Sequence, residues 1–238
     1  MYYHLRDHIY ITQFRDELIL LDTKIDKYTI CFKEFSELLN EILENNTASL
    51  SQSSQNLAFT QKLLDDNVIE GTHSSYPFQI DKKIKSDGVS NVDWRLPLEN
   101  KKISLNIQVL KALFTLIKVN LYIKIRGLYP TIQLIKKSRK NQVQYLIPTE
   151  EELNDLARIV NTACFLHPTR IKCLEWAMTF VLLALKRRWK CNLEIGVQNY
   201  PFFAHAWVEC DGKVVMDSQY LREDLAIILN EPFRRLKI

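Results

Sequence analysis

The most constraining feature of this sequence is a strongly apolar helix pattern in its second half. After Pro168 the chain reads TRIKCLEWAMTFVLLALKRR, with apolar residues at Leu174, Ala177, Met178, Val181, Leu182 and Leu185. Recurrence at i, i+3, i+4, i+7, i+8 and i+11 predicts a helix with a buried face. The segment is therefore expected to lie in the core of the domain that contains it.

One cysteine falls at the predicted start of this helix. Thr169 is the expected N-cap, which places Cys173 in or near the first turn, beside the buried stripe. Unpaired backbone N–H groups and the positive helix end favour a thiolate there, and such settings lower a thiol pKa from about 8.5 to roughly 3.5–7.5. Cys173 is therefore a candidate nucleophile.

A β-hairpin is predicted further along, in the segment NLEIGVQNYPFFAHAWVECDGKVVMD. Its two apolar stretches flank Asp211-Gly212, a pair of residues typical of tight hairpin turns. A two-residue turn would pair Cys210 with Lys213. In that register Asp217 would lie on the opposite face of the hairpin from His205.

A second register of the same hairpin brings a histidine and an acid together. A three-residue loop would pair Glu209 with Lys213 and place His205 directly opposite Asp217. Cross-strand neighbours have Cβ atoms about 4.5–5.5 Å apart, within reach of a carboxylate–imidazole hydrogen bond. We expect this second register, because it alone gives the histidine an orienting acid.

These three side chains suggest a division of labour in acyl-group chemistry. Cys173 would attack a carbonyl carbon, and its backbone N–H is one candidate oxyanion donor. His205 would accept the thiol proton and later protonate the leaving amine. Asp217 would fix the imidazole tautomer and support the imidazolium.

A simpler explanation exists for each cysteine and histidine taken alone. Most buried cysteines are small core residues, and Cys191 and Cys210 look like core residues of this kind. Cys164 and His167 lie near Cys173 in the sequence, but no second well-spaced pair completes four zinc ligands. We therefore expect no metal site.

Composition limits the compartment and the cofactors. Five cysteines form no repeating pattern, which favours a reducing compartment over a disulfide framework. The sequence has no signal-peptide pattern, and its longest apolar run, from Met178 to Leu185, is too short for a membrane span. No two of the five glycines are close enough for a phosphate-binding loop. We expect a cytoplasmic protein that binds no cofactor directly and has no nucleic-acid partner, although a net charge of +4 by itself neither implies nor excludes nucleic-acid binding.

The first 75 residues predict a small domain of three strands and two helices. Residues 9–14, 17–22 and 27–32 have the short apolar patterns of an antiparallel meander. Apolar residues at helical spacing follow, at Phe35, Leu38, Leu39, Ile42 and Leu43, and a further helix is expected from about Leu57 to Val68.

A linker and a larger domain are predicted beyond this unit. Residues 76–100 are rich in Ser, Asp, Gly and Pro and are assigned to the linker, with residues 101–238 as the second domain. The second domain is expected to open with a long amphipathic helix. Thr149 and Glu152 have capping-box spacing, which predicts the start of a helix through Val160.

The C-terminal motifs resemble a known family of peptidases. Cys-Leu at the start of a helix, an I-G-V strand, P-F, H-A-W-V-E and an Asp after the next strand are similar to the core of lasso-peptide B proteins, the McjB-type leader peptidases. That group belongs to the transglutaminase-like cysteine proteases. Cys173, His205 and Asp217 fall on its three catalytic positions. The N-terminal unit resembles the PqqD-like, winged-helix-like leader-recognition domain that is fused to such proteins.

This resemblance implies an α+β fold and a specific reaction. A PqqD-like domain would precede a papain-like, transglutaminase-like peptidase domain, and the enzyme would remove the leader from a lasso-peptide precursor. The leader would add a strand to the edge formed by Tyr28, Thr29, Ile30, Cys31 and Phe32. In the family, an asparagine-synthetase-like cyclase that uses ATP closes the freed core. Any ATP dependence would therefore come from that partner.

Two alternatives remain open from the sequence. A transglutaminase or an arylamine acetyltransferase uses the same three residue types but passes the acyl group to an amine. A non-enzymatic winged-helix protein could instead bind nucleic acid or a peptide. The expected recognition helix, FTQKLLDDN, carries more acid than base, which disfavours binding to phosphates.

Overall fold

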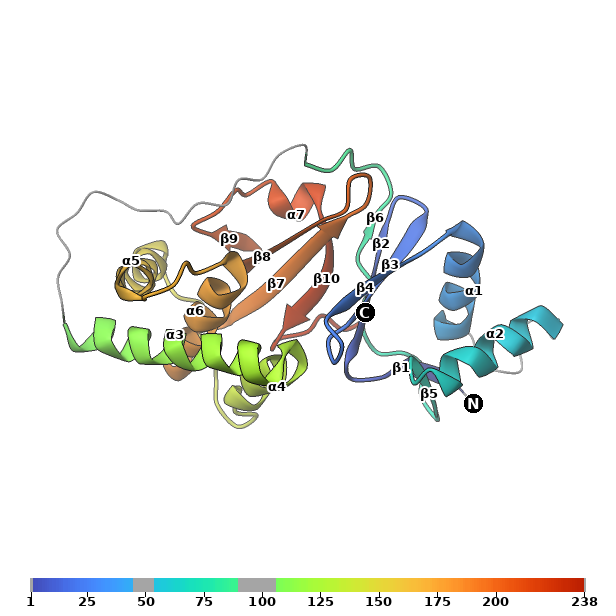
Figure 1. The fold of residues 1–238 in the computed structure, drawn as a ribbon, viewed down its shortest axis with the longest axis horizontal. Coiled ribbons are helices and arrows are strands. Elements are labelled where there is room, and N and C mark those ends of the chain that lie inside the picture. Colours follow the sequence, from blue (N-terminus) through green and yellow to red (C-terminus); the bar gives the residue numbers. More distant parts are fainter. Residues whose placement is uncertain (1, 45–53, 90–105, 238) are drawn as a thin grey trace.

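The computed structural model describes residues 2–44, 54–89 and 106–237. Figure 1 shows two units side by side, with α1 and α2 on the far side of the N-terminal strands from β10. Helices and strands both contribute to each unit, so the predicted α+β class is confirmed. The winged-helix likeness of the N-terminal unit stays a prediction.

The N-terminal meander forms as predicted. β2 (Ile9–Phe14), β3 (Glu17–Asp22) and β4 (Lys27–Cys31) pair antiparallel in that order. α1 (Lys33–Glu44) follows and buries Leu39, Ile42 and Leu43 of its predicted apolar face, whereas Phe35 of that face is exposed. α2 (Ser54–Asp65) starts about three residues before the expected position.

Three further strands complete this unit, and the sequence analysis missed all of them. β1 (Tyr2–Leu5) pairs with β5 (Ile69–Thr72), and the two-residue β6 (Lys82–Lys83) runs parallel to β2. The main sheet therefore has the order β4-β3-β2-β6, with β4 at one edge. β6 belongs to the segment predicted as a linker, so part of that segment extends the sheet.

The second unit packs helices on one face of an antiparallel sheet. The helices are α3 (Ile107–Arg126), α4 (Leu128–Ser138), α5 (Glu150–Leu166) and α6 (Cys173–Lys186). The sheet has the order β10-β7-β8-β9, with bounds Ala226–Glu231, Cys191–Gln198, Phe203–Cys210 and Lys213–Val215. The short α7 (Leu221–Asp224) precedes β10. Every residue of α6 from Trp176 to Leu185 is buried, as the apolar pattern predicts.

The start of α5 is as predicted from the sequence, whereas the start of α6 is not. At α5 the predicted capping box forms: the Glu152 N–H donates to Thr149 Oγ1, and the Thr149 N–H donates to Glu152 Oε2. α6 begins at Cys173, so Thr169 is not its N-cap. Lys172 takes that position with extended backbone, and Cys173 becomes the first residue of the helix.

A shared core joins the two units. Tyr10, Phe14, Ile19 and Leu21 project from the N-terminal sheet into the same apolar cluster as α6 and the C-terminal sheet. The other face of the N-terminal sheet packs against α1. The division into residues 1–75, 76–100 and 101–238 stays a prediction, and residues 90–100 lie outside the described part of the chain.

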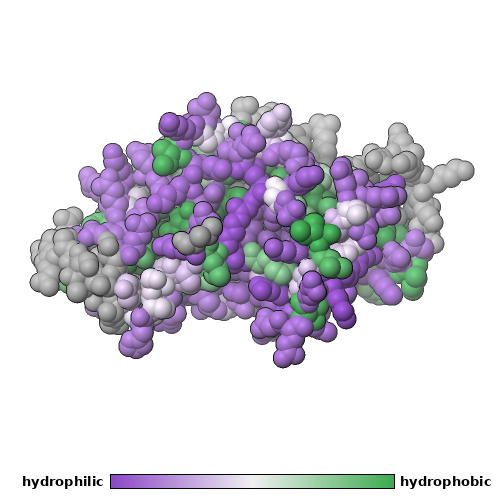
Figure 2. All heavy atoms as spheres, turned by 180° about the vertical axis from the view of Figure 1, so that it is seen from behind, coloured by the Kyte–Doolittle hydropathy of each residue, from purple (hydrophilic) through white to green (hydrophobic). Residues whose placement is uncertain are grey.

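The surface carries no broad apolar belt on the side that Figure 2 shows. Hydrophilic side chains cover most of this face, and hydrophobic side chains form small separate groups. Among the helices in the described ranges, none is both long enough and apolar enough to cross a bilayer.

Candidate active site

The hairpin that carries His205 has a two-residue turn, and not the three-residue loop that we expect from the sequence. Cys210 pairs with Lys213 across a two-residue turn, so the predicted pairing of Glu209 with Lys213 is wrong. Both turn residues have positive φ, 48° at Asp211 and 84° at Gly212, which is the conformation that a tight primed turn requires. The local preference of Asp-Gly therefore decides the register.

Asp217 nevertheless reaches His205, by a different route. β9 ends at Val215, and Met216 takes a left-handed backbone with φ of 56°, which turns the chain out of the strand pairing. The Asp217 carboxylate then lies 2.7 Å from the ring of His205, Oδ2 to Nε2. The backbone N–H of Ser218 donates to the other carboxylate oxygen at 2.8 Å and helps to fix it.

The thiol of Cys173 lies against the same histidine. It hydrogen-bonds with the His205 ring and with the backbone N–H groups of Ala206 and Leu174. Burial alone would raise the pKa of this thiol. The hydrogen bonds and the nearby imidazolium charge outweigh burial, so the pKa of Cys173 lies below its ordinary value. The structure thus brings the sulfur, the imidazole and the carboxylate together.

The His205 side chain is only 2% exposed, yet it favours its charged form. Burial works to lower its pKa, but the hydrogen bonds to Asp217 and Cys173 raise the pKa to about 9. Because Asp217 contacts Nε2, the remaining nitrogen, Nδ1, is the one available to the sulfur. Both pKa shifts favour a thiolate–imidazolium pair over a neutral thiol beside a neutral imidazole.

The other cysteines lack this environment. All five cysteines are free. Burial raises the pKa of Cys31 to about 11 and, as the larger of two causes, that of Cys164 to about 12. Cys191 and Cys210 are buried cross-strand neighbours on β7 and β8.

The five residues predicted to bind the leader lie on or just after the edge strand β4. Tyr28 and Ile30 pack toward the core shared with the second unit, whereas Cys31 packs toward α1. Phe32 follows the strand and is 65% exposed. Phe35 on α1 is 45% exposed and contacts the ring of Phe59 on α2, with centroids 5.3 Å apart. Exposed aromatic rings thus accompany the open strand edge.

Tyr28 on this edge lies near enough to Cys173 for the charge of the cysteine to affect it, which the sequence did not predict. Its ring lies 5.1 Å from the ring of Phe202, which immediately precedes β8. Burial raises the pKa of Tyr28 to about 12, and the negative charges of Asp26 and Cys173 add to that effect. The contact of Tyr28 with Phe202 depends on how the two sheets pack, and no local sequence pattern predicts it.

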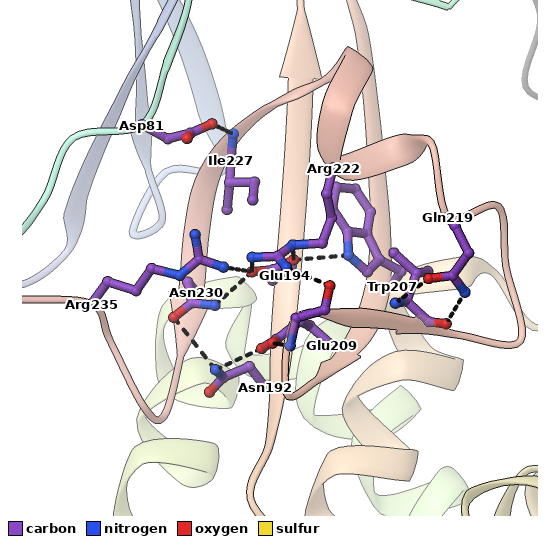
Figure 3. A network of polar contacts seen from close by, with 12 residues as sticks. Asp81, Asn192, Glu194, Trp207, Glu209, Gln219, Arg222, Ile227, Asn230 and Arg235 are labelled. Carbon is purple, nitrogen blue, oxygen red and sulfur yellow. Dashed lines mark hydrogen bonds and ion pairs between the residues drawn. The ribbon is translucent and has the colours of Figure 1, made fainter. Parts of the chain in front are cut away.

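A buried polar network lies in the second sheet and was also missed. Glu194 on β7 is fully buried (Figure 3). Its carboxylate forms ion pairs with Arg222 at 3.1 Å and Arg235 at 3.2 Å, and it accepts hydrogen bonds from Asn230 and Trp207. Burial raises the pKa of Glu194 to about 7, while Arg222 opposes the shift. A glutamate inside an apolar strand is the signal that could have revealed this network.

The described residues offer little to a metal ion. No group of three or more His, Cys, Asp or Glu side chains among them has an arrangement that could hold one. Cys164 and His167 remain near the start of α6 in sequence, without forming such a group.

Two comparisons with known proteins agree with this geometry. Residues 115–230, which include all three side chains, match the family model of the transglutaminase-like superfamily. The Microcin J25-processing protein McjB of Escherichia coli is 24% identical over 228 residues, which cover 92% of this chain and 96% of McjB. No solved structure matches the chain. The resemblance to McjB-type proteins that the motifs indicate is confirmed.

Proposed function

We propose, from the premise that this is a McjB-type protein with a transglutaminase-like domain, that the chain removes the leader from a lasso-peptide precursor as a cysteine peptidase. The observation that carries the proposal is the contact between Cys173 and His205 beside the 2.7 Å bond from His205 to Asp217. The name of McjB, a microcin-processing protein, supports a precursor peptide as substrate.

The first half-reaction forms a thioester. The Cys173 thiolate attacks the carbonyl carbon of the scissile peptide bond, and the backbone N–H of Cys173 is a candidate donor to the developing oxyanion. The C–N bond then breaks as His205 delivers its Nδ1 proton to the leaving amine. The core peptide departs with a free amino group, and the leader stays attached to the sulfur.

The second half-reaction releases the leader. A water molecule attacks the thioester carbon while neutral His205 accepts its proton, and the C–S bond breaks to give a leader carboxylate. The hydrogen bond from His205 Nε2 to Asp217 keeps Nδ1 of the imidazole directed at the sulfur in both half-reactions. The thiolate–imidazolium pair is then restored for another turnover.

The edge of β4 is the proposed leader-binding site. A leader strand added there would form backbone hydrogen bonds along Tyr28–Phe32, and Phe32 and Phe35 would contact its side chains. Because Tyr28 lies near Cys173, a leader held on β4 keeps its scissile bond close to the nucleophile. This arrangement raises the effective concentration of the cleavage site.

Substitution of the nucleophile tests the proposal. Cys173→Ala should reduce release of the leader by at least about a thousandfold while leader binding persists. Intact-mass analysis of a candidate lasso-peptide precursor incubated with the chain would measure the cleavage. Cys164→Ala removes another thiol of the same domain and should keep cutting. Leader release by Cys173→Ala at the wild-type rate would overturn the assignment.

The proposed partner is an asparagine-synthetase-like cyclase, through which any ATP dependence would arise. Incubation of the precursor and the chain, with and without cyclase and ATP, shows whether cleavage depends on the cyclase, on ATP or on neither. Cleavage by the chain alone would show that ATP serves the partner's step. Cleavage that needs ATP without the cyclase would contradict this assignment.

Acyl transfer is the second candidate, favoured by the match to the transglutaminase-like superfamily. It shares the thioester and differs only in the acceptor of the acyl group. Mass analysis of the products decides between them. Water as acceptor gives two free peptides whose masses sum to the precursor plus one water, whereas an amine gives a crosslinked product.

A further inference from the structure

The ring of His205 lies in a row of three aromatic side chains along one face of β8. Its centroid is 6.2 Å from that of Phe203 and 6.0 Å from that of Trp207, with interplanar angles of 31° and 35°. Residues two apart on a strand share a face, so this row follows from strand geometry. The histidine therefore has an aromatic neighbour on each side along β8.

The place directly across from His205 on β7 is filled by the same tryptophan. Gly196 pairs with His205 and carries no side chain. A Cβ at Gly196 would lie 2.4 Å from Cη2 of Trp207 and 2.7 Å from its Cζ3. The benzo ring of Trp207 thus occupies the space that a cross-strand neighbour of His205 would otherwise take.

The other end of the indole is held by the buried carboxylate. Trp207 Nε1 donates to Glu194 Oε2 at 2.9 Å, and both side chains are almost fully buried. Arg222 from α7 and Arg235 near the C-terminus hold Glu194 in place, as Figure 3 shows. An indole anchored at its N–H and packed over a glycine has little freedom to rotate.

We infer that Glu194 is a positioning residue that acts through Trp207 to hold the His205 ring between Cys173 and Asp217. This inference rests on the proposed function for the roles of Cys173 and His205. Glu194 contacts neither substrate nor reacting atoms. It sets the rotamer of the indole, and the indole limits the rotation of the imidazole.

The charged and titratable groups around His205 and around Glu194 make the inference testable. His205 faces Cys173 from α6 and Asp217 after β9, and Tyr28 from β4 lies near the cysteine. Glu194 faces Arg222, Arg235 and Glu209. If the imidazole loses its alignment, the hydrogen bonds that raise the His205 pKa and lower the Cys173 pKa both weaken. The pH range over which the charged pair exists then narrows from both sides.

The test is the pH dependence of Cys173 alkylation in the full chain. Iodoacetamide serves as the probe, and peptide mass mapping separates Cys173 from the other cysteines. In the wild type, alkylation should already be fast below the ordinary thiol pKa of about 8.5. Trp207→Phe keeps an aromatic ring and all charges but removes the anchored N–H. We expect its alkylation to rise at higher pH and to be about tenfold slower near pH 7.

Matched variants separate positioning from general destabilisation. Trp176→Phe also removes a buried indole hydrogen bond, to Asn161, and should leave the alkylation profile unchanged. Glu194→Gln should shift the profile in the same direction as Trp207→Phe. In precursor cleavage, Trp207→Phe should lower kcat and leave KM unchanged. Because loss of folded protein would also lower the apparent kcat, the alkylation profile of Trp207→Phe compared with that of Trp176→Phe decides between positioning and destabilisation.

The possible outcomes distinguish this inference from the proposed function. A wild-type profile with an ordinary thiol pKa would contradict the nucleophile assignment itself. A low wild-type pKa with identical profiles for Trp207→Phe and Trp176→Phe would overturn the positioning role and leave the peptidase proposal standing. A shift in Trp207→Phe and Glu194→Gln, but not in Trp176→Phe, is the predicted result.

Discussion

Each of the two main sheets has an end strand near the active site, β4 in one sheet and β9 in the other, and these two strand edges differ. At β4 the edge is accompanied by exposed aromatic side chains, Phe32 and Phe35. At β9 the Gln219 side chain covers the edge. Its amide accepts from the Val214 N–H at 3.0 Å and donates to the Val214 carbonyl at 2.6 Å.

This difference suggests separate tasks for the two edges. A side-chain amide bonded to both backbone groups of Val214 takes the place of a neighbouring strand and blocks pairing there. β9 leads to Asp217, the hydrogen-bond partner of His205, whereas β4 is the edge that we propose binds the leader. Changes near β9 should therefore affect kcat or stability, and changes near β4 should affect KM.

The largest effect on activity is expected at Asp217, which follows the end strand β9. Asp217→Ala removes the partner of His205 Nε2, so the imidazole loses both its orientation and the support for its charge. We expect kcat for leader release to fall by about a hundredfold or more with KM nearly unchanged. Asp211→Asn, at the exposed hairpin turn, removes a carboxylate but keeps a residue that tolerates positive φ, so this matched control should retain activity. A KM effect without a kcat effect would break the proposed separation.

A smaller effect on activity is expected next to the edge strand β4. Phe35→Ala removes a half-exposed ring beside β4 that the leader would cover. We expect KM to rise about tenfold, equivalent to about 1.4 kcal/mol, with kcat unchanged at saturating precursor. Ile125→Ala removes an exposed apolar side chain from α3 and should have no effect. Isothermal titration with the leader alone would measure the binding part; equal leader affinities for the two variants would count against β4.

The smallest effect is expected when the Gln219 amide is removed from the edge of β9. Gln219→Ala leaves two backbone groups of Val214 without their partner, which should lower the free energy of unfolding by about 1 kcal/mol in urea titrations. Leader affinity should not change, because the leader is expected on the other sheet. A gain of leader binding in this variant would show that β9 can also accept a strand.

The accuracy of the sequence-based predictions varied with the range of the interaction. Strands 9–14 and 17–22 and the capping box at Thr149 depend on local patterns, and they form as predicted. The predicted hairpin register is wrong because the turn preference of Asp-Gly, and not the pairing of His205 with Asp217, decides which residues face each other. The approach of Asp217 to His205 was anticipated, but it depends on the left-handed turn at Met216.

Contacts between distant segments were beyond the reach of local patterns. β1 and β5 pair across more than sixty residues of sequence (Tyr2 with Thr72), and neither has a strong strand pattern. The proximity of Tyr28 to Cys173 depends on how the two sheets pack. Neither spacing nor composition encodes such contacts, so they could be found only in the folded chain.

The central claim is that Cys173 is the nucleophile that a bound leader reaches, and a leader-derived electrophile tests it most directly. A leader peptide that ends in a vinyl sulfone at the scissile position can be incubated with the wild type and with Phe35→Ala, and the adduct mapped by mass spectrometry. The account predicts one adduct per chain, on Cys173, formed about tenfold more slowly in Phe35→Ala at subsaturating peptide. An adduct on another cysteine, or an unmodified Cys173, would contradict it.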